Sequence, residues 1–408
     1  MTDDLGLFKD TVDDMEQPSS TTRTGGRRER RQALERRRRR IVLGTVVVVL
    51  ALAVGGVLFG IRQLEELRKT PDFAGAGGAA AVVQVEDGQS LSAIGAALVR
   101  RNVVASVRAF TLAADADPRA RAVQPGYYQL REQMSGSAAV ARLQEPAARV
   151  GQLEIRGGAQ LDDVRLPDGK TVPGLFTEIS RASCAVNGGT STCVSSEELR
   201  TAMSQTDLAQ LEVPVWAADA LSRVEPRLRL EGLLVPGNYD VRPGSSAVEL
   251  LRQVTGASVA RLLAAGFPAT AGGAGYSAYE ILVIASVIER EAIAPDFGRV
   301  SRVIYNRLAA GMPLQMDSTI NYPLDLQQVR TSEADRARPG PYNTYLNGGL
   351  PVSPIGSPGA AAISAALNPE PGDWRYFVKC QRDGTSCFSV TIEEHGTAVR
   401  DAAGRGVF

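Results

Sequence analysis

After residue 80, hydrophobic and polar residues alternate with strand or helix periods along most of the chain. Val82–Glu86 alternates like a half-buried strand, and apolar residues then recur at helical spacing after Ser90, which can cap that helix. A second helix is predicted at Ser106–Ala113, followed by a turn and a strand in QPGYYQL. Residues 81–145 therefore predict a small α/β module.

The next region, 146–250, is also α/β in character. A further strand begins in ARVGQLEIRG, and a Cys-containing insertion rich in Gly, Ser and Thr runs from about Ala182 to Ser195. The segment LEGLLVPGNYDV predicts an extended stretch followed by a Pro-Gly-Asn turn. Ser245 or Ser246 can cap the helix that follows.

In the last third, a helix from Tyr279 contains the uncharged run Ile281–Ile288 and then two carboxylates, Glu289 and Glu291. A soluble helix normally keeps its charges on a separate face from its apolar stripe. This helix is therefore predicted to be buried all round, with its acids at the end.

Residues 251–408 continue with a helix in RVSRVIYNRLAAG, which Gly311 can end. A short polar segment, MPLQMDSTINY, comes next, and PYNTYLNGGLPVSPIGSPG is rich in turns. A helix from about Ala360 to Leu367, a hairpin in WRYFVKC and CFSVTI, and a last helix from EEHGTAV complete the pattern. The predicted fold class is α+β.

The N-terminal region adds a membrane anchor. Ile41–Ile61 has no charged residue and can span about 30 Å of hydrocarbon as a helix. Nine arginines precede it between Arg27 and Arg40, so we expect the N-terminus to be cytoplasmic and everything after Ile61 to be extracytoplasmic. A buried core helix and a nucleic-acid-binding tail are the weaker interpretations. Overall charge is balanced, 45 basic against 45 acidic residues, and indicates no partner.

The predicted organisation has six parts. They are a disordered Arg-rich tail (1–40), a transmembrane helix (41–61), a linker (62–80), the α/β module (81–145), an α/β region with the Cys-containing insertion (146–250) and a catalytic domain (251–408).

The four cysteines form two local pairs, Cys184 with Cys193 and Cys380 with Cys387. These spacings suit small loops closed by disulfides in an oxidising extracytoplasmic space. Zinc binding is the less favoured alternative because neither pair is C-x-x-C and His395 is the only histidine. We expect no metal and no cofactor.

Glu289 is the candidate for chemistry. On a helix it shares a face with Leu282, Ala285 and Ser286, so its carboxyl group would be partly desolvated. Desolvation favours the protonated form of a carboxyl group, which a general acid at a glycosidic oxygen requires. Glu291 lies about 200° further round the helix and suits a surface ion pair or a brace for a neighbouring loop.

A structural alternative pairs Glu289 with an arginine such as Arg307. Against it stand two short motifs of uncharged or acidic hydrogen-bonding side chains near Gly and Pro positions, which suit recognition of sugar hydroxyl and N-acetyl groups. Their members are Asn306, Gln315, Asp317, Thr319, Asn343 and Thr344.

Four motifs, in order, resemble the YceG-like family of endolytic murein transglycosylases: IASVIEREA, VIYNRLAAGMPLQMDSTINY, PYNTYLNGGLPVSPIGSPGAAAISAALNP and YFV…F…T…EH. The resemblance covers roughly Val82–Val399. The module at 81–145 is similar to the LysM-like module of such proteins, which binds cell-wall glycan, although a structural spacer is an equally good interpretation. The segments IRGGAQ and LEGLLVPGNY depart from the family pattern and lie outside the catalytic third.

The resemblance implies cleavage between N-acetylmuramic acid and N-acetylglucosamine in nascent strands. The muramoyl C6 hydroxyl attacks C1 and leaves a 1,6-anhydro end. The family's catalytic glutamate would be Glu289, acting first as acid and then as base. The motif residues, with Tyr342 and His395, become candidates for binding substrate or orienting Glu289.

Other functions stay open from sequence. A non-catalytic, membrane-anchored glycan-binding protein or scaffold would need no acid, and a hydrolytic muramidase would use Asp317 as a second carboxylate. The partners we expect are peptidoglycan glycan strands, membrane lipid and peptidoglycan synthases of the penicillin-binding type, with no nucleic acid.

Overall fold

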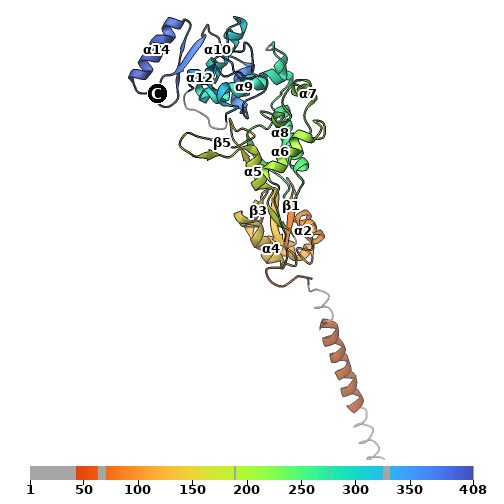
Figure 1. The fold of residues 1–408 in the computed structure, drawn as a ribbon. Helices are drawn as coiled ribbons and strands as arrows, with labels where there is room; N and C mark the ends of the chain where they lie inside the picture. Colours follow the sequence, from red (N-terminus) through yellow and green to blue (C-terminus); the bar gives the residue numbers. More distant parts are fainter. Residues whose placement is uncertain (1–42, 63–69, 188–189, 274, 325–330, 408) are drawn as a thin grey trace, which may run out of the picture. The chain divides into compact units, whose positions relative to one another are not determined.

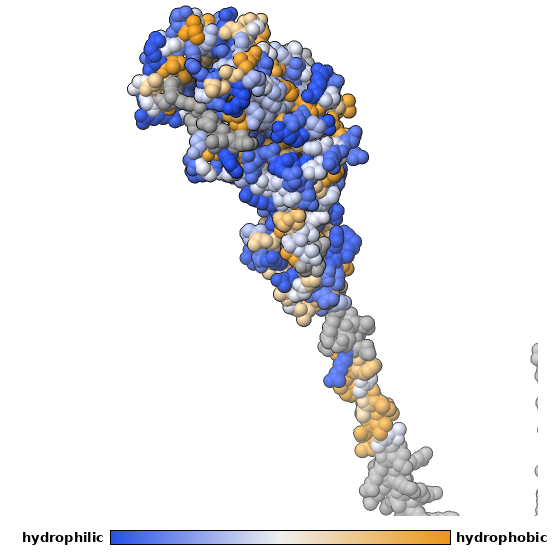
Figure 2. Space-filling view, viewed as in Figure 1, coloured by the Kyte–Doolittle hydropathy of each residue, from blue (hydrophilic) through white to orange (hydrophobic). Residues whose placement is uncertain are grey.

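The computed structural model describes residues 43–62, 70–187, 190–273, 275–324 and 331–407. The chain divides into two units, 1–69 and 70–408. In the first, a helix from Leu43 to Arg62 has a mean hydropathy of 2.5 and is long and apolar enough to cross a membrane. Its apolar side chains are exposed along the helix surface (Figure 2). The predicted apolar helix is confirmed, and the predicted tail at 1–40 lies outside the described residues.

The second unit begins with an antiparallel sheet covered by helices (Figure 1). Its strand order is β1-β2-β3. Ser90 and Ser106 cap the first two helices by accepting the amides of Ala93 and Ala109. The predicted strand, helix, helix and strand are confirmed. The elements are β1 (Ala80–Val85), α2 (Leu91–Arg100), α3 (Val107–Ala116), η1 (Pro118–Ala122), β2 (Gly126–Arg131), α4 (Gly136–Leu143), η2 (Pro146–Ala148) and β3 (Arg149–Val150).

This module has a hydrophobic core of its own, built from residues 81–148. Leu98 and Leu130 are fully buried in it, and Phe110 is 1% exposed. Gly95 lets α2 approach α3 closely, since a Cβ there would lie 3.1 Å from the Phe110 ring. The module thus has the apolar interior that an independently packed α/β unit needs.

The middle region contains short paired strands and three helices. Strand β4 pairs antiparallel with β9, with Leu153 opposite Tyr239, which lies 86 residues further along the chain. The elements are β4 (Gln152–Ile155), β5 (Val164–Arg165), β6 (Thr171–Val172), α5 (Leu175–Ala182), β7 (Ala185–Asn187), β8 (Thr190–Thr192), α6 (Ser196–Gln205), α7 (Val215–Leu221), η3 (Pro226–Leu228) and β9 (Gly237–Asp240).

The predicted Pro-Gly-Asn turn is wrong. Turns occupy the residues around Leu233 and Leu234, and Gly237 and Asn238 instead begin β9. The physical reason is that the turns at this point allow three leucines to be fully buried at once: Leu230, Leu233 and Leu234. An extended segment would have placed Leu233 and Leu234 on opposite faces.

The last third is mostly helical, with one hairpin. Ser246, the second of the two predicted residues, caps α8, and Ser277 with Glu280 forms a capping box at the start of α9. The elements are α8 (Ala247–Ala264), η4 (Ala269–Gly273), α9 (Ala278–Glu291), η5 (Ala294–Asp296), α10 (Phe297–Ala309), α11 (Asp317–Asn321), α12 (Glu333–Arg336), α13 (Ala360–Leu367), β10 (Tyr376–Lys379), β11 (Ser386–Ser389) and α14 (Ile392–Gly404).

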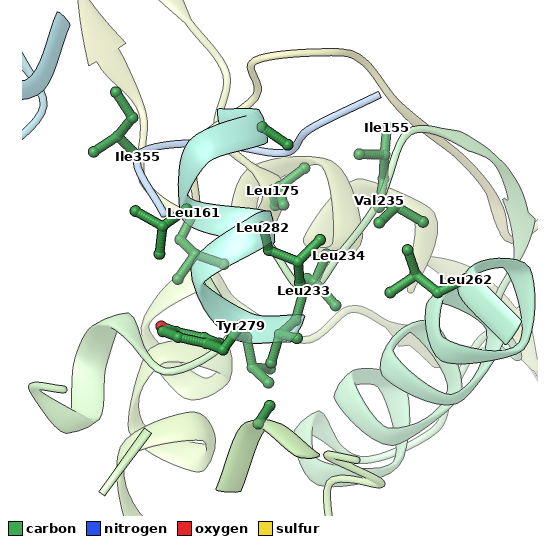
Figure 3. Close-up of a cluster of buried hydrophobic side chains, with 14 of the residues drawn as sticks. Ile155, Leu161, Leu175, Leu233, Leu234, Val235, Leu262, Tyr279, Leu282 and Ile355 are labelled. Atoms are coloured by element: carbon green, nitrogen blue, oxygen red, sulfur yellow. The ribbon is translucent and has the colours of Figure 1, made fainter. Parts of the chain in front are cut away.

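Helix α9 lies within a large core that draws residues from 153 to 366. Every residue from Ile281 to Ile288 is buried, as the uncharged run predicts. In Figure 3, Leu161 and Ile355 lie on one side of α9, and Val235 and Leu262 lie on the other. The predicted boundary at residue 250 falls inside this shared core.

Both predicted disulfides are present, Cys184–Cys193 at the β7–β8 hairpin and Cys380–Cys387 at the β10–β11 hairpin. The second hairpin also contacts the segment that follows α9. The buried Asp296 accepts the amide of Ser386 at 2.7 Å, and a Cβ on Gly384 would lie 3.1 Å from Ile293. This disulfide therefore closes a loop that supports the end of α9.

Replacing both Cys380 and Cys387 by alanine should lower the free energy of unfolding by about 2 kcal/mol, because the unfolded chain regains the entropy of a short closed loop. Chemical denaturation of the variant and of wild type measures the difference. The paired change Cys184→Ala/Cys193→Ala is the matched control for the general loss of a crosslink. Equal stability of the Cys380/Cys387 variant and wild type would contradict the expectation.

Candidate active site

The two carboxylates that end α9 face different parts of the molecule. The carboxyl group of Glu289 contacts the backbone at Gly157 and Gly359, whereas that of Glu291 contacts Ser318 of α11. Side chains two positions apart on an α-helix point about 200° apart, which explains why Glu289 and Glu291 face different segments. As the sequence predicts, the two acids do not share one small site.

Glu289 is half-buried between two backbone segments. Its Oε2 accepts the amide of Gly359, the N-cap residue of α13, at 3.0 Å. On the other side, a Cβ at Gly157 would lie only 2.2 Å from its Oε1. A carboxylate at a helix N-terminus is favourable because unpaired amides and the helix dipole both attract it. Glu289 therefore joins α13 to the turn at Gly157.

The turn at 157–161 pairs with the segment before α13. Gly158 donates its amide to the carbonyl of Ser357, and Ser357 donates its amide to the carbonyl of Ala159, both at 2.8 Å. Arg290 also donates to the carbonyl of Gly158, at 3.2 Å. The IRGGAQ segment lies outside the catalytic third in sequence, yet the structure places it in contact with the end of α9.

Glu291 contacts the polar MPLQMDSTINY segment. Its Oε1 accepts the amide of Ser318, in the first turn of α11, at 3.0 Å. Burial raises the pKa of Glu291, and the negative charge of Asp317 adds to this effect, while the Ser318 contact and Lys379 oppose it. The predicted bracing of a neighbouring loop is thus observed, and Glu291 is half-buried, as Glu289 is.

Helix α11 is joined to the turn-rich motif by a compact set of hydrogen bonds. Gln315 donates its amide to the carbonyl of Thr344, and Met316 donates its amide to the Thr344 hydroxyl, both at 3.0 Å. The hydroxyl groups of Thr319 and Thr344 lie 2.8 Å apart and are buried. The structure thus brings together three of the predicted residues, Gln315, Thr319 and Thr344, and Thr344 hydrogen-bonds to both of the others.

Asp317 has several partners of its own. Its Oδ1 accepts the hydroxyl of Tyr345 at 2.6 Å and that of Thr331 at 2.7 Å, and Arg336 lies 3.6 Å from its Oδ2. Tyr345 was not among the predicted residues. Its place directly after Asn343 and Thr344 was the available signal.

Tyr342 and Asn343 are also buried and internally bonded. The hydroxyl groups of Tyr342 and Ser353 lie 2.6 Å apart. Asn343 donates to the carbonyls of Arg336 and Arg338 and accepts the amide of Tyr345. Both side chains therefore fix the turns around them.

Asn306 and His395 belong to a different group, around the C-terminal hairpin. Asn306 donates to the carbonyls of Gly372 and Trp374. His395 stacks on Tyr376 with ring centroids 5.4 Å apart. Burial, together with the nearby positive charge of Arg307, lowers the pKa of His395, which favours the neutral ring.

Arg307 does not pair with Glu289. Its guanidinium donates to the carbonyls of Arg375, at 2.6 Å, and of Leu314, at 2.7 Å. It also lies 5.1 Å from the centre of the Tyr376 ring. The arginine thus connects the hairpin to the segment before α11, and the suggested pairing of Glu289 with Arg307 is wrong.

Glu231 is a buried acid that the sequence analysis did not single out. Only 1% of it is exposed, and its Oε2 accepts the amide of Leu161 at 3.2 Å and the hydroxyl of Tyr322 at 2.9 Å. Burial raises its pKa to about 8. A lone acid inside the apolar run RLEGLLV was the signal that could have found it.

The YceG-like family model matches residues 83–401. This chain belongs to the YceG-like family. Proteins named endolytic murein transglycosylase are similar to it. The one from Bacillus subtilis (strain 168) is 27% identical over 354 residues, which are 85% of this chain and 90% of the relative. The one from Streptococcus pneumoniae serotype 2 (strain D39) is 26% identical over 68% of this chain, which spans half of that relative.

A crystal structure of a YceG-like protein from Listeria monocytogenes is also similar. It has 25% sequence identity and a TM-score of 0.52, and it covers 78% of this chain and 98% of the solved chain. The α+β fold described above is therefore a YceG-like fold.

In this YceG-like chain, Gly157→Ala should lower the free energy of unfolding by about 1–3 kcal/mol, because the added methyl group overlaps the Glu289 carboxyl. Thermal or urea unfolding measures the change. Gly348→Ala is the matched control, since a Cβ there meets nothing within 4 Å. An unchanged Gly157→Ala variant would show that the turn does not press on Glu289.

Glu231 also predicts how stability depends on pH. Its pKa is raised from 4.5 to about 8 in the folded protein, so its contribution to stability is complete below pH 4.5 and is lost as pH rises through 8. The Glu231→Gln variant cannot ionise there. Between pH 5 and pH 8, wild type should therefore lose up to about 4 kcal/mol of stability relative to this variant, measured by urea unfolding. Parallel pH curves would contradict the prediction.

Proposed function

We propose that this chain is a membrane-anchored endolytic murein transglycosylase with Glu291 as its acid and base. The observation that carries the proposal is a desolvated carboxyl group at the end of an apolar helix. Burial raises the pKa of Glu291, and the group adjoins α11 and its polar neighbours. Its relatives named endolytic murein transglycosylase support the reaction class.

In the proposed reaction, protonated Glu291 gives its proton to the oxygen between N-acetylmuramic acid and N-acetylglucosamine. The bond from C1 of the muramoyl residue to that oxygen breaks. The C6 hydroxyl of the same residue forms a bond to C1, and Glu291 accepts its proton. The products are a 1,6-anhydro end and a new N-acetylglucosamine end, which limits glycan strand length. No water and no second carboxylate take part.

The two acids of α9 differ in their partners, and this difference favours Glu291 as the catalytic acid. Glu289 is already committed to the Gly359 amide at the N-terminus of α13 and is packed against Gly157. A carboxyl group held by the amide of a helix N-terminus is fixed in place by that contact. Glu289 therefore suits a structural carboxylate, and its catalytic assignment from sequence stays a prediction to be tested beside Glu291.

Hydrolysis is the nearest alternative, with Asp317 activating a water. Asp317 is occupied by the hydroxyl groups of Tyr345 and Thr331 and by Arg336. These contacts occupy the carboxylate oxygens that would have to bind and activate a water. They support Asp317 as the residue that positions α11 beside Glu291.

The remaining proposals concern location and partners. We infer that the Leu43–Arg62 helix anchors the protein with the Arg-rich N-terminus in the cytoplasm, beside anionic lipid, and residues 70–408 outside. The two disulfides suit that oxidising side. The LysM-like module at 81–145 is proposed to bind glycan, and peptidoglycan synthases are the proposed protein partners.

The test compares Glu291→Gln and Glu289→Gln in the full-length protein, purified in detergent and incubated with uncross-linked glycan strands. Mass spectrometry of the products should show anhydro ends from wild type and at least a hundredfold fewer from Glu291→Gln. Glu289→Gln should retain at least a tenth of the activity and lose stability instead.

The reverse pattern would return the catalytic role to Glu289. Reducing ends in place of anhydro ends would show hydrolysis, and Asp317→Asn would then be the next variant. Strands that are bound but not cut by wild type would leave the non-catalytic binding protein as the function.

A further inference from the structure

Glu231 joins two segments that frame the end of α9. Its Oε2 accepts the amide of Leu161, which ends the turn at 157–161, and the hydroxyl of Tyr322, the C-cap residue of α11. The other end of the same turn contacts Glu289, and the other end of α11 gives the amide of Ser318 to Glu291. One buried side chain thus connects the surroundings of both acids.

The pattern of contacts at Glu231 fits a neutral carboxylic acid. Both donors converge on Oε2, as they would on the carbonyl oxygen of a protonated carboxyl group. Oε1 is buried and has no partner among the described residues, which a charged oxygen would tolerate poorly. Burial raises the pKa of Glu231, which agrees with this geometry.

Among the described residues, the charged groups near Glu231 act on its negative charge in opposite directions. Arg290 of α9 attracts it, while Asp162 repels it. Tyr322, Tyr279 and Tyr342 surround it with hydroxyl groups whose pKa values burial raises, so they remain neutral. Ionisation would therefore leave a buried charge with weak compensation and would loosen the contacts to Leu161 and Tyr322.

We propose that Glu231 is a positioning residue of the transglycosylase, which in its neutral form holds α11 and the turn at 157–161 together and so keeps the Ser318 amide against Glu291. The inference rests on the proposed function. Glu231 does not touch the reacting atoms. It acts through Tyr322 and α11, and its ionisation switches the active arrangement off at alkaline pH.

Two variants of the full-length protein separate this role from simple folding. Glu231→Gln keeps a carbonyl oxygen for both donors but cannot ionise near neutral pH, and Glu231→Leu keeps the volume but removes the acceptor. At pH 6.5, the Gln variant should keep kcat within about twofold of wild type. The Leu variant should lose at least tenfold in kcat with KM changed less than threefold, at a temperature where circular dichroism shows it folded.

The pH profile is the decisive measurement. Between pH 7 and pH 9, kcat of wild type should fall about tenfold further than kcat of Glu231→Gln, because only wild type carries an ionisable group at this position. A Leu variant that does not fold leaves this comparison intact. Identical profiles for wild type and the Gln variant overturn the Glu231 proposal alone, whereas strands left uncut by wild type at every pH overturn the proposed function.

Discussion

The burial of the apolar run in α9 is the constraint on which the rest of the structure depends. Every residue from Ile281 to Ile288 is buried, so neighbours must cover this stretch of the helix on all its faces. The helix then ends in two acids that remain close to that core. Because a carboxylate removed from water must find donors, each acid recruits a backbone amide from a distant segment, Gly359 in one case and Ser318 in the other. Burial of the helix thereby dictates which loops gather at its end.

Local patterns predicted much of this arrangement. Ser90 and Ser106 cap helices because their side chains answer a purely local need for hydrogen-bond acceptors. The uncharged run before Glu289 predicted a buried helix segment, and the cysteine spacings predicted two small loops closed by disulfides. Each of these features is decided by residues only a few positions apart, which is why sequence could show them.

Contacts between distant segments could not be predicted in this way. Gly157 leaves room for the Glu289 carboxyl group, and Glu231 contacts Leu161 and Tyr322, which lie 70 and 91 residues away along the chain. No periodicity in IRGGAQ or LEGLLV records those partners. The same limit explains the misplaced turn before β9, because strand pairing with β4 and burial of three leucines overrode the local turn preference of Pro-Gly-Asn. It also explains why hydrogen-bonding residues such as Thr319, Thr344 and Asn343, which suggested sugar recognition, prove to bind one another and the backbone.

Through the Cys380–Cys387 hairpin, the support of the end of α9 depends on whether the surrounding compartment is oxidising or reducing. This hairpin packs against Ile293 and Asp296, which follow the two acids of α9. A newly made chain in a reducing compartment would have these cysteines as thiols, and the loop between them would be open. In the extracytoplasmic location proposed above, the last support of the acid-bearing helix end would be added only after export. Maturation of the protein would then be tied to arrival in the oxidising compartment.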